Sequence, residues 1–184
     1  MMACWPDPDH ASAEELVDQL QLAPHPEGGW YRELHRSVAQ VRREDGELRS
    51  ALTHIVYLLA AGGLSRWHRV RGSDELWQFV AGDPLELWTL PPEGGEAQAH
   101  CLAPPALAHA GAQGGGDDGV ADAGSGAIAS VHVVPAGWWQ AARAPGRWTL
   151  VSCVVAPGFA FEDFDLLREL PAWQHPPGAV AALL

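Results

Sequence analysis

Short runs of apolar residues, separated by turns rich in glycine and proline, dominate this chain. The strongest runs cover residues 30–35, 52–60, 75–80, 84–90, 131–134 and 148–156. Apolar runs of this length between turn signals are typical of strands, and many of them in succession favour a sandwich or a barrel. The sequence therefore predicts an all-β domain, with a hairpin turn at residues 81–83.

Two segments near the ends have a helical pattern instead. Ser12 is followed three residues later by Glu15, which is the signature of a capping box at the start of a short amphipathic helix. Towards the other end, Phe161, Phe164 and Leu167 share one helical face. We expect a short helix there, covering an opening of the barrel.

The composition changes at two places along the chain. Residues 104–127 are rich in glycine and alanine and nearly free of large apolar side chains, which predicts a flexible loop inserted into a single domain over residues 12–170. Residues 171–184 are rich in proline and alanine, and we expect a loosely ordered tail.

Charge and cysteine content limit the partners and the compartment. The chain has 11 basic and 23 acidic residues, a net charge of −12, which disfavours nucleic acid and anionic membranes as partners. No secretory signal is visible, and no apolar run approaches the ~20 residues that span a bilayer. Three widely spaced cysteines without a Cys-x-x-Cys motif indicate a reducing compartment. We expect a cytoplasmic protein that binds neither membranes nor nucleic acid.

Two segments punctuated by glycine contain the candidate chemistry. Residues 62–82 hold His68 and Glu75, and a Pro-x-Gly turn at 135–137 is followed by Gln140. On a strand, Glu75, Trp77 and Phe79 share a face, so a carboxylate would lie among aromatic walls. Burial there would raise the pKa of Glu75 and lower that of His68, as in acid/base pairs that work near neutrality. A structural polar pair in the barrel mouth explains the pattern equally well.

Three further positions have both a functional and a structural interpretation. Trp138 shares a face with Gln140 and could stack on a ring-shaped ligand, although packing also explains it. His54 stands in an apolar strand and either points into the lumen or is a core histidine with a backbone or hydroxyl partner, which we favour. The Gly-Gly turn before Tyr31 leads into a strand that could pair with a partner's sheet, which we favour. Alternatively, Glu27, Tyr31 or Arg32 closes one end of the pocket, and Tyr31 is the residue we expect to face it.

The spacing of these residues resembles a known family. Gly62-x5-His68-x-Val70-x4-Glu75-x6-Gly82 resembles the first cupin motif, and residues 129–140, ending in Gln140, resemble the second. The stretches at 24–33, 65–69, 74–77 and 156–159 look like the cupin-5 family, a domain of unknown function. The resemblance covers about residues 16–170.

The resemblance implies a cupin double-stranded β-helix, an RmlC-like jelly-roll barrel with short N- and C-terminal helices that usually pairs as a homodimer. Metal-dependent cupins hold a divalent ion with three histidines and a glutamate. Here His68 and Glu75 match that set, Val70 replaces one histidine and Gln140 another. Valine cannot bind a metal, and an amide oxygen is a weak neutral ligand. The resemblance therefore predicts a degenerate site for a divalent metal on His68, Glu75 and Gln140.

These observations favour a protein that holds a small molecule in the lumen around His68, Glu75 and Gln140. In a catalytic version, His68 is the base and Glu75 its orienting partner or the acid. One alternative is an isomerase or epimerase that acts on a carbohydrate or similar polar metabolite. Another is a metal-dependent oxygenase, which needs the imidazole of His54. The other residues expected to bind a ligand are Trp77, Phe79, Trp138, Tyr31, His54 and Ser65.

Overall fold

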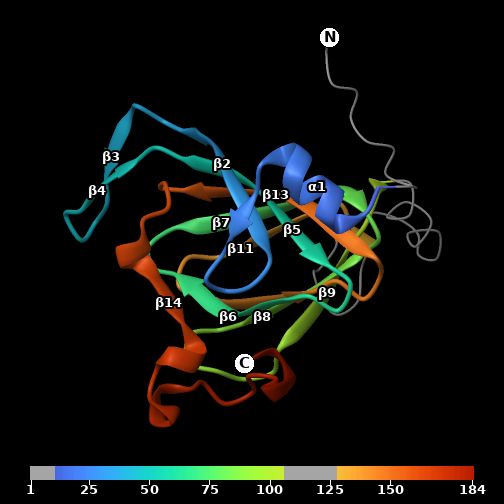
Figure 1. Ribbon diagram of the computed structural model, residues 1–184. Coiled ribbons are helices and arrows are strands. Elements are labelled where there is room, and N and C mark those ends of the chain that lie inside the picture. Colours follow the sequence, from blue (N-terminus) through green and yellow to red (C-terminus); the bar gives the residue numbers. More distant parts are fainter. Residues whose placement is uncertain (1–10, 106–127) are drawn as a thin grey trace, which may run out of the picture.

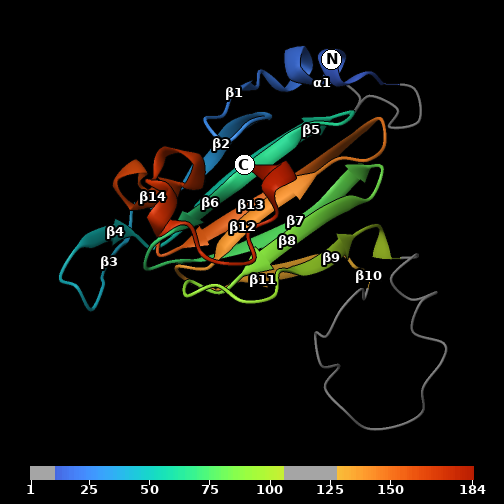
Figure 2. The same ribbon diagram turned by 90° about the horizontal axis from the view of Figure 1, so that it is seen from below.

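Two six-stranded sheets lie face to face in the computed structural model, which describes residues 11–105 and 128–184 (Figures 1 and 2). In spatial order, the first sheet contains β1 (Ala23–Pro24), β2 (Trp30–Arg36), β5 (Thr53–Ala60), β13 (Trp148–Ala156), β7 (Asp74–Gly82) and β11 (Val131–Val134). The second contains β10 (Ile128–Ala129), β9 (Gln98–Leu102), β8 (Leu85–Leu90), β12 (Trp139–Arg143), β6 (Leu64–Val70) and β14 (Phe164–Leu166). The prediction of an all-β, jelly-roll architecture is confirmed.

The remaining elements are short. β3 (Gln40–Arg42) and β4 (Leu48–Ser50) form a separate hairpin that extends from the sheets (Figure 1). Four 3-10 turns follow β13, namely η1 (Phe161–Asp163), η2 (Leu167–Glu169), η3 (Ala172–Gln174) and η4 (Ala181–Leu183). Nearly all of the predicted 104–127 insertion, from residue 106 onward, lies outside the described residues.

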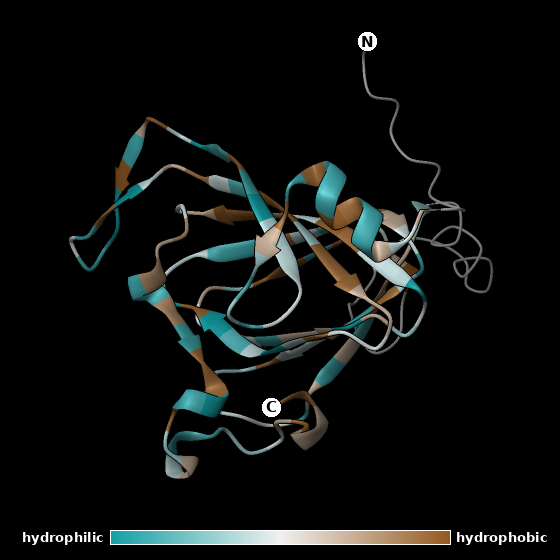
Figure 3. Cartoon of the chain, viewed as in Figure 1, coloured by the Kyte–Doolittle hydropathy of each residue, from teal (hydrophilic) through white to brown (hydrophobic). Residues whose placement is uncertain are grey.

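The α-helix α1 (Ala13–Leu20) begins at the predicted capping box. The backbone N–H of Glu15 donates to Ser12 Oγ over 3.2 Å, and the N–H of Ser12 donates to Glu15 Oε2 over 2.9 Å. The helix has a hydrophilic and a hydrophobic side (Figure 3). Its apolar side packs on the outer face of the first sheet, where Leu16 joins Leu58 and Trp148 in one buried cluster.

The turn at residues 81–83 is not the predicted hairpin. It leads from β7 in the first sheet to β8 in the second, and these strands do not pair: β7 pairs with β13 and β11, and β8 with β12 and β9. A glycine turn gives the same local signal in both cases, whereas the apolar faces of β7 and β8 can share one core only from opposite sheets. Gly82 has φ +94° and lies so close to Trp148 that a Cβ would overlap it.

The predicted C-terminal helix is also wrong. Residues 161–169 form a 3-10 turn, the short strand β14 and a second 3-10 turn, and β14 pairs antiparallel with β6 at the edge of the second sheet. Pairing with β6 satisfies backbone groups of an edge strand, which a helix would leave exposed. Phe164 and Leu167 consequently diverge: Phe164 lines a cavity, and Leu167 packs in a different buried cluster.

The tail beyond residue 171 contacts the outer side of the second sheet. Leu183 is buried in a cluster with Trp67 and Trp139, and Trp67 Nε1 donates to the Val180 carbonyl over 3.1 Å. The looseness of the tail stays a prediction, but these contacts give it a defined position. Over residues 11–105 and 128–184, no helix has the length and hydropathy needed to cross a bilayer.

Four tryptophans are almost completely buried. Trp67, Trp77, Trp139 and Trp148 are at most 2% exposed. Of these four, Trp77 alone lines the cavity described below, and the others fill the clusters outside the two inner sheet faces.

Candidate functional site

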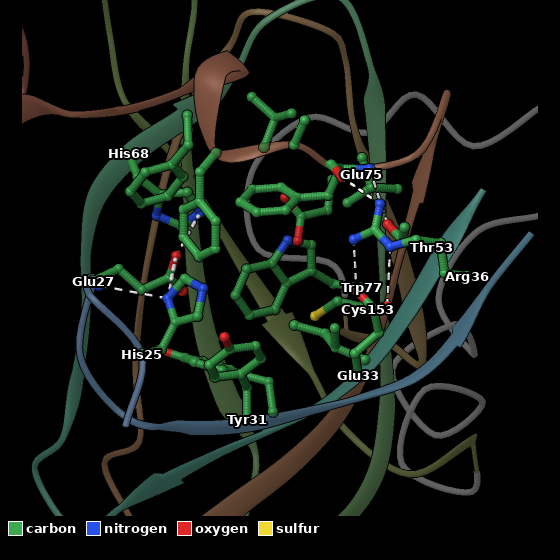
Figure 4. A pocket seen from close by; sticks show the side chains of 18 residues that line it. His25, Glu27, Tyr31, Glu33, Arg36, Thr53, His68, Glu75, Trp77 and Cys153 are labelled. Carbon is green, nitrogen blue, oxygen red and sulfur yellow. Dashed lines mark hydrogen bonds and ion pairs between the residues drawn. The ribbon is translucent and has the colours of Figure 1, made fainter. Parts of the chain in front are cut away.

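A cavity of about 220 Å³ lies between the two sheets (Figure 4). Strands β2, β5, β7 and β13 of the first sheet and β6 of the second contribute its walls, together with residues 25–27 and 159–164. The aromatic lining residues are Tyr31, Tyr57, Trp77, Phe159, Phe161 and Phe164. Two buried glutamates and one buried histidine, Glu27, Glu75 and His68, give this mainly apolar space its chemistry.

Glu75 is held as a neutral carboxylic acid. Gln140 Nε2 donates to Glu75 Oε2 over 2.6 Å, and Gln140 Oε1 accepts from Trp77 Nε1 over 2.8 Å. Because an indole N–H can only donate, Trp77 fixes which end of the amide faces Glu75. Burial, together with the charge of Glu27, raises the pKa of Glu75 to about 8. The carboxyl is therefore mainly protonated at pH 7.

Glu27, in contrast to Glu75, is held as an ionised carboxylate. Its Oε1 accepts from Ser65 Oγ over 2.8 Å, and its Oε2 lies 3.2 Å from His68 Nε2 and 3.3 Å from His25 Nδ1. Burial alone would raise the pKa of Glu27, but the charge interaction with His68 and the contacts with His25 and Ser65 outweigh it and lower the pKa to about 2. Glu27 is an anion at neutral pH.

His68 has a defined tautomer. Its Nδ1 lies 2.8 Å from the Arg66 carbonyl oxygen, which can only accept, so Nδ1 carries a proton. Burial lowers the pKa of His68, and in the neutral ring Nε2 is then an acceptor that faces Glu27. The expected shifts of His68 and Glu75 are thus both found, with opposite directions and burial as the main cause.

The other predicted ligand-binding residues divide into two groups. Tyr31 and Trp77 line the cavity. Phe79 and Trp138 pack in the buried cluster between the sheets without lining it, and Ser65 acts only through Glu27. The shared inward face of Glu75, Trp77 and Phe79 is confirmed, since all three are buried.

His54 does not contribute to the cavity. Thr53, Ile55 and Tyr57 of β5 line it, so the alternation of the strand turns His54 to the opposite face. There His54 Nε2 lies 2.7 Å from Ser152 Oγ. The expectation that His54 binds a ligand is corrected, and the favoured alternative, a histidine with a hydroxyl partner, is confirmed.

Sequence reasoning named Glu27 only as a residue that could close one end of the pocket, and it did not name His25 as part of the site. They belong to the turn before β2, whose Gly28 and Gly29 have φ +115° and +66°. A Cβ on Gly28 would overlap the Leu64 carbonyl oxygen, so glycine lets this turn lie directly against β6. A charged residue immediately before such a glycine pair was the available signal.

A second polar group closes the opposite side of the cavity (Figure 4). Arg36 Nη2 donates to Glu33 Oε2 over 2.6 Å, Nε donates to Oε1 over 3.0 Å, and Nη1 donates to the Phe159 carbonyl over 2.9 Å. The guanidinium thereby ties β2 to the segment that carries Phe159 and Phe161.

The residues predicted to hold a metal do not fit one. The Gln140 oxygen is taken by Trp77, its nitrogen faces Glu75, and His68 Nε2 faces Glu27. Val70 lines the cavity where the cupin motif has a second histidine. Within the described ranges, no group of three or more His, Cys, Asp or Glu side chains is arranged to hold a metal ion. The set His68, Glu75 and Gln140 is therefore not a metal centre in this arrangement.

Solved structures resemble this fold at two levels of sequence identity. A hypothetical protein from Leishmania major is 30% identical, with a TM-score of 0.68 over 84% of this chain and 86% of that one. A protein from Shewanella oneidensis is also 30% identical, with a TM-score of 0.65 over 85% and 84% of the two chains. Oxalate decarboxylase from Bacillus subtilis is 15% identical, with a TM-score of 0.51 over 80% of this chain and 31% of that one, which supports the fold alone.

A search of curated proteins gave no match. The family model described as "Cupin superfamily (DUF985)" matches residues 14–167, which include both sheets and every polar residue of the cavity. The motifs, the two facing sheets and this match agree, and the chain belongs to the DUF985 family of the cupin superfamily.

Proposed function

We propose that the cavity binds a small ligand and catalyses proton transfer on it, with Glu75 as the acid and His68, backed by Glu27, as the base. The observation that carries this proposal is the opposite ionisation of two buried carboxyl groups that line one cavity. Pairs of groups whose surroundings drive their pKa values apart are typical of acid/base sites.

The acid is arranged to donate. Gln140 occupies Oε2 of Glu75, which leaves Oε1 to carry the proton towards a ligand in the cavity. A carboxylic acid with a pKa of about 8 is mainly protonated at neutral pH and can still release its proton, as general acids near neutrality must.

The base is arranged to accept. The Arg66 carbonyl fixes the tautomer of His68 with its lone pair on Nε2, the nitrogen that faces Glu27. When Nε2 takes a proton from a ligand, the anionic carboxylate of Glu27 at 3.2 Å stabilises the imidazolium that forms. The proton thus moves from ligand to His68 on one side and from Glu75 to ligand on the other.

This geometry favours an isomerase or epimerase type of reaction on a small polar metabolite. Such a reaction removes a proton at one position and delivers one at another, with no net redox change, and needs no group beyond these side chains. No step of the proposal uses a metal, because the residues expected to bind one support the acid and the base instead.

The first test is the protonation state of Glu75. Infrared difference spectra of wild type minus Glu75→Gln should contain the carbonyl band of a protonated carboxylic acid at pH 7, and this band should disappear as the pH rises through about 8. A band absent at pH 6 would contradict the role of Glu75 as an acid.

The second test is proton exchange. Hydroxyketones, aldoses, lactones and amino acids are incubated with the protein in D₂O, and loss of C–H signals is followed by NMR. Exchange on one class should fall about 100-fold or more in both Glu75→Gln and His68→Asn. Ligand binding without exchange, unchanged in both variants, would support a binding protein and overturn the catalytic proposal.

A further inference from the structure

We propose that the cavity recognises a small organic cation whose ammonium group is seated between Glu27 and His68. The inference rests on the proposed function in using the same cavity, and it adds the chemical class of the ligand.

The first observation is a pair of acceptors that face each other at one corner of the cavity. Glu27 Oε2 and His68 Nε2 are 3.2 Å apart. The Arg66 carbonyl accepts the proton on His68 Nδ1, so the neutral ring has a lone pair at Nε2, and a carboxylate has no proton to give. Two acceptors at hydrogen-bond distance repel each other unless a donor lies between them. A group with several N–H bonds satisfies both.

The second observation is the charge of this corner. The side-chain neighbours of the Glu27 carboxylate are Ser65 Oγ, His68 Nε2 and His25 Nδ1, the last at 3.3 Å, and Arg66 reaches only the Glu27 backbone carbonyl, at 3.4 Å. Arg36, the arginine among the lining residues, is on the opposite side of the cavity and is held by Glu33 and the Phe159 carbonyl. A buried anion is costly without a positive partner, and a cationic ligand supplies one.

The third observation is the set of rings around the same corner. The ring of His25 makes edge contacts with Tyr31, Tyr57 and Phe164 at centroid distances of 4.6 to 5.9 Å, and Phe164 lies 5.5 Å from the ring of His68. Aromatic faces attract cations, and the attraction grows when water is excluded. A carboxylate beside aromatic walls is a suitable site for a protonated amine with an apolar body.

The same features disfavour anions. A ligand carboxylate placed here would meet the anion of Glu27 and the lone pair of His68. The acid Glu75, in contrast, can donate to a carbonyl or hydroxyl oxygen at another point of the cavity. The ligand that fits is therefore an amine that also carries an uncharged oxygen acceptor.

The test uses three probes of one shape: benzylamine, benzyl alcohol and sodium benzoate. Binding to the full chain is measured by calorimetry and by the NMR signals of the His68 ring. We expect benzylamine to bind about tenfold more tightly than benzyl alcohol, since a hydrogen bond to a charged group is worth about 1.4 kcal/mol more than a neutral one. Benzoate should bind most weakly. In Glu27→Gln the preference for the amine should vanish.

Glu75→Gln is the matched control, because it changes the other carboxyl of the cavity. It should keep the preference for benzylamine while losing the proton exchange, so failure of the catalytic proposal and failure of this one give different results. If circular dichroism shows that Glu27→Gln does not fold, His68→Gln replaces it and should weaken benzylamine binding several-fold.

Three results would overturn the inference. The first is binding of benzoate at least as tight as that of benzylamine. The second is the absence of any change in the His68 NMR signals when benzylamine is added up to its solubility limit. The third is a ¹⁵N spectrum of free protein at pH 7.5 with both ring nitrogens of His68 protonated, because His68 itself would then be the partner of Glu27.

Discussion

Gln140 donates its amide N–H to Oε2 of Glu75 over 2.6 Å. The resemblance to metal-dependent cupins matches Gln140 to the position of a histidine ligand and Glu75 to the position of an anionic ligand. Here the amide, oriented by Trp77, supports a carboxyl group that burial keeps protonated. A position that resembles part of a metal site therefore supports an acid instead.

The raised pKa of Glu75 predicts a pH-dependent stability. Between its ordinary value of 4.5 and about 8, the folded protein binds the Glu75 proton and the unfolded chain does not. The contribution of Glu75 to the free energy of unfolding is therefore present below pH 4.5 and is lost as the pH rises through about 8, by about 1.4 kcal/mol per pH unit at most. Glu75→Gln removes this dependence of the free energy of unfolding on pH.

The measurement is urea unfolding of both proteins from pH 4.5 to 9. The difference in the free energy of unfolding between wild type and Glu75→Gln cancels the titration of other groups, such as His68. A difference that does not change with pH over this interval would show that Glu75 is ionised in the folded state.

Trp77→Phe should change the protonation of Glu75 indirectly, because the indole N–H of Trp77 bonds to Gln140. Loss of the indole N–H leaves the Gln140 oxygen without its partner, so the amide can rotate and accept the Glu75 proton instead. The pKa of Glu75 should then rise further, and stability should fall by about 1–3 kcal/mol. Infrared titration of the carboxylic acid band measures the pKa. In a Gln140→Met background, Trp77→Phe should no longer raise the pKa of Glu75, and a rise that persists there would contradict the role of the amide.

Asp163 joins the β3–β4 hairpin to the wall of the cavity. It accepts from Arg43 Nη1 over 2.9 Å and from Arg49 Nε over 2.7 Å, and all three side chains are at most 14% exposed. Asp163 ends the turn η1, whose first residue, Phe161, lines the cavity. The hairpin thus holds a cavity wall in place.

Asp163→Asn should consequently destabilise the protein by about 2–3 kcal/mol and weaken ligand binding, because two buried guanidinium groups lose the anion that they share and keep only the more exposed Asp45 and Glu47. Glu86→Gln is the control: the Glu86–Arg143 pair is 37% and 46% exposed, and its loss should cost less than about 1 kcal/mol. Urea unfolding measures both. Equal losses in the two variants would show that burial of the Asp163 cluster contributes nothing.

Alternation along strands made much of this structure predictable. It placed Glu75, Trp77 and Phe79 on the inner face, and the Ser12–Glu15 pair marked the start of α1, because both signals are local. The pairing of β14 with β6 and the passage from β7 to β8 were not predictable, since they depend on which distant strand offers a free edge or a shared core. The pairing of Glu27 with His68 was not predictable for the same reason, because the two residues are 41 positions apart.

The donor arrangement predicts that His68 does not bind a divalent metal tightly. A metal at His68 and Glu75 would have to displace Glu27 from His68 Nε2, turn the Gln140 amide against Trp77 and ionise a carboxyl whose pKa is about 8. Each step costs free energy that a site with three histidines and a glutamate does not lose. Untagged protein, loaded with Mn²⁺, Ni²⁺ or Zn²⁺ and desalted, should therefore retain less than one metal per chain, and His68→Ala should retain the same amount. Stoichiometric metal in wild type that is lost in His68→Ala would contradict both this prediction and the metal-free mechanism.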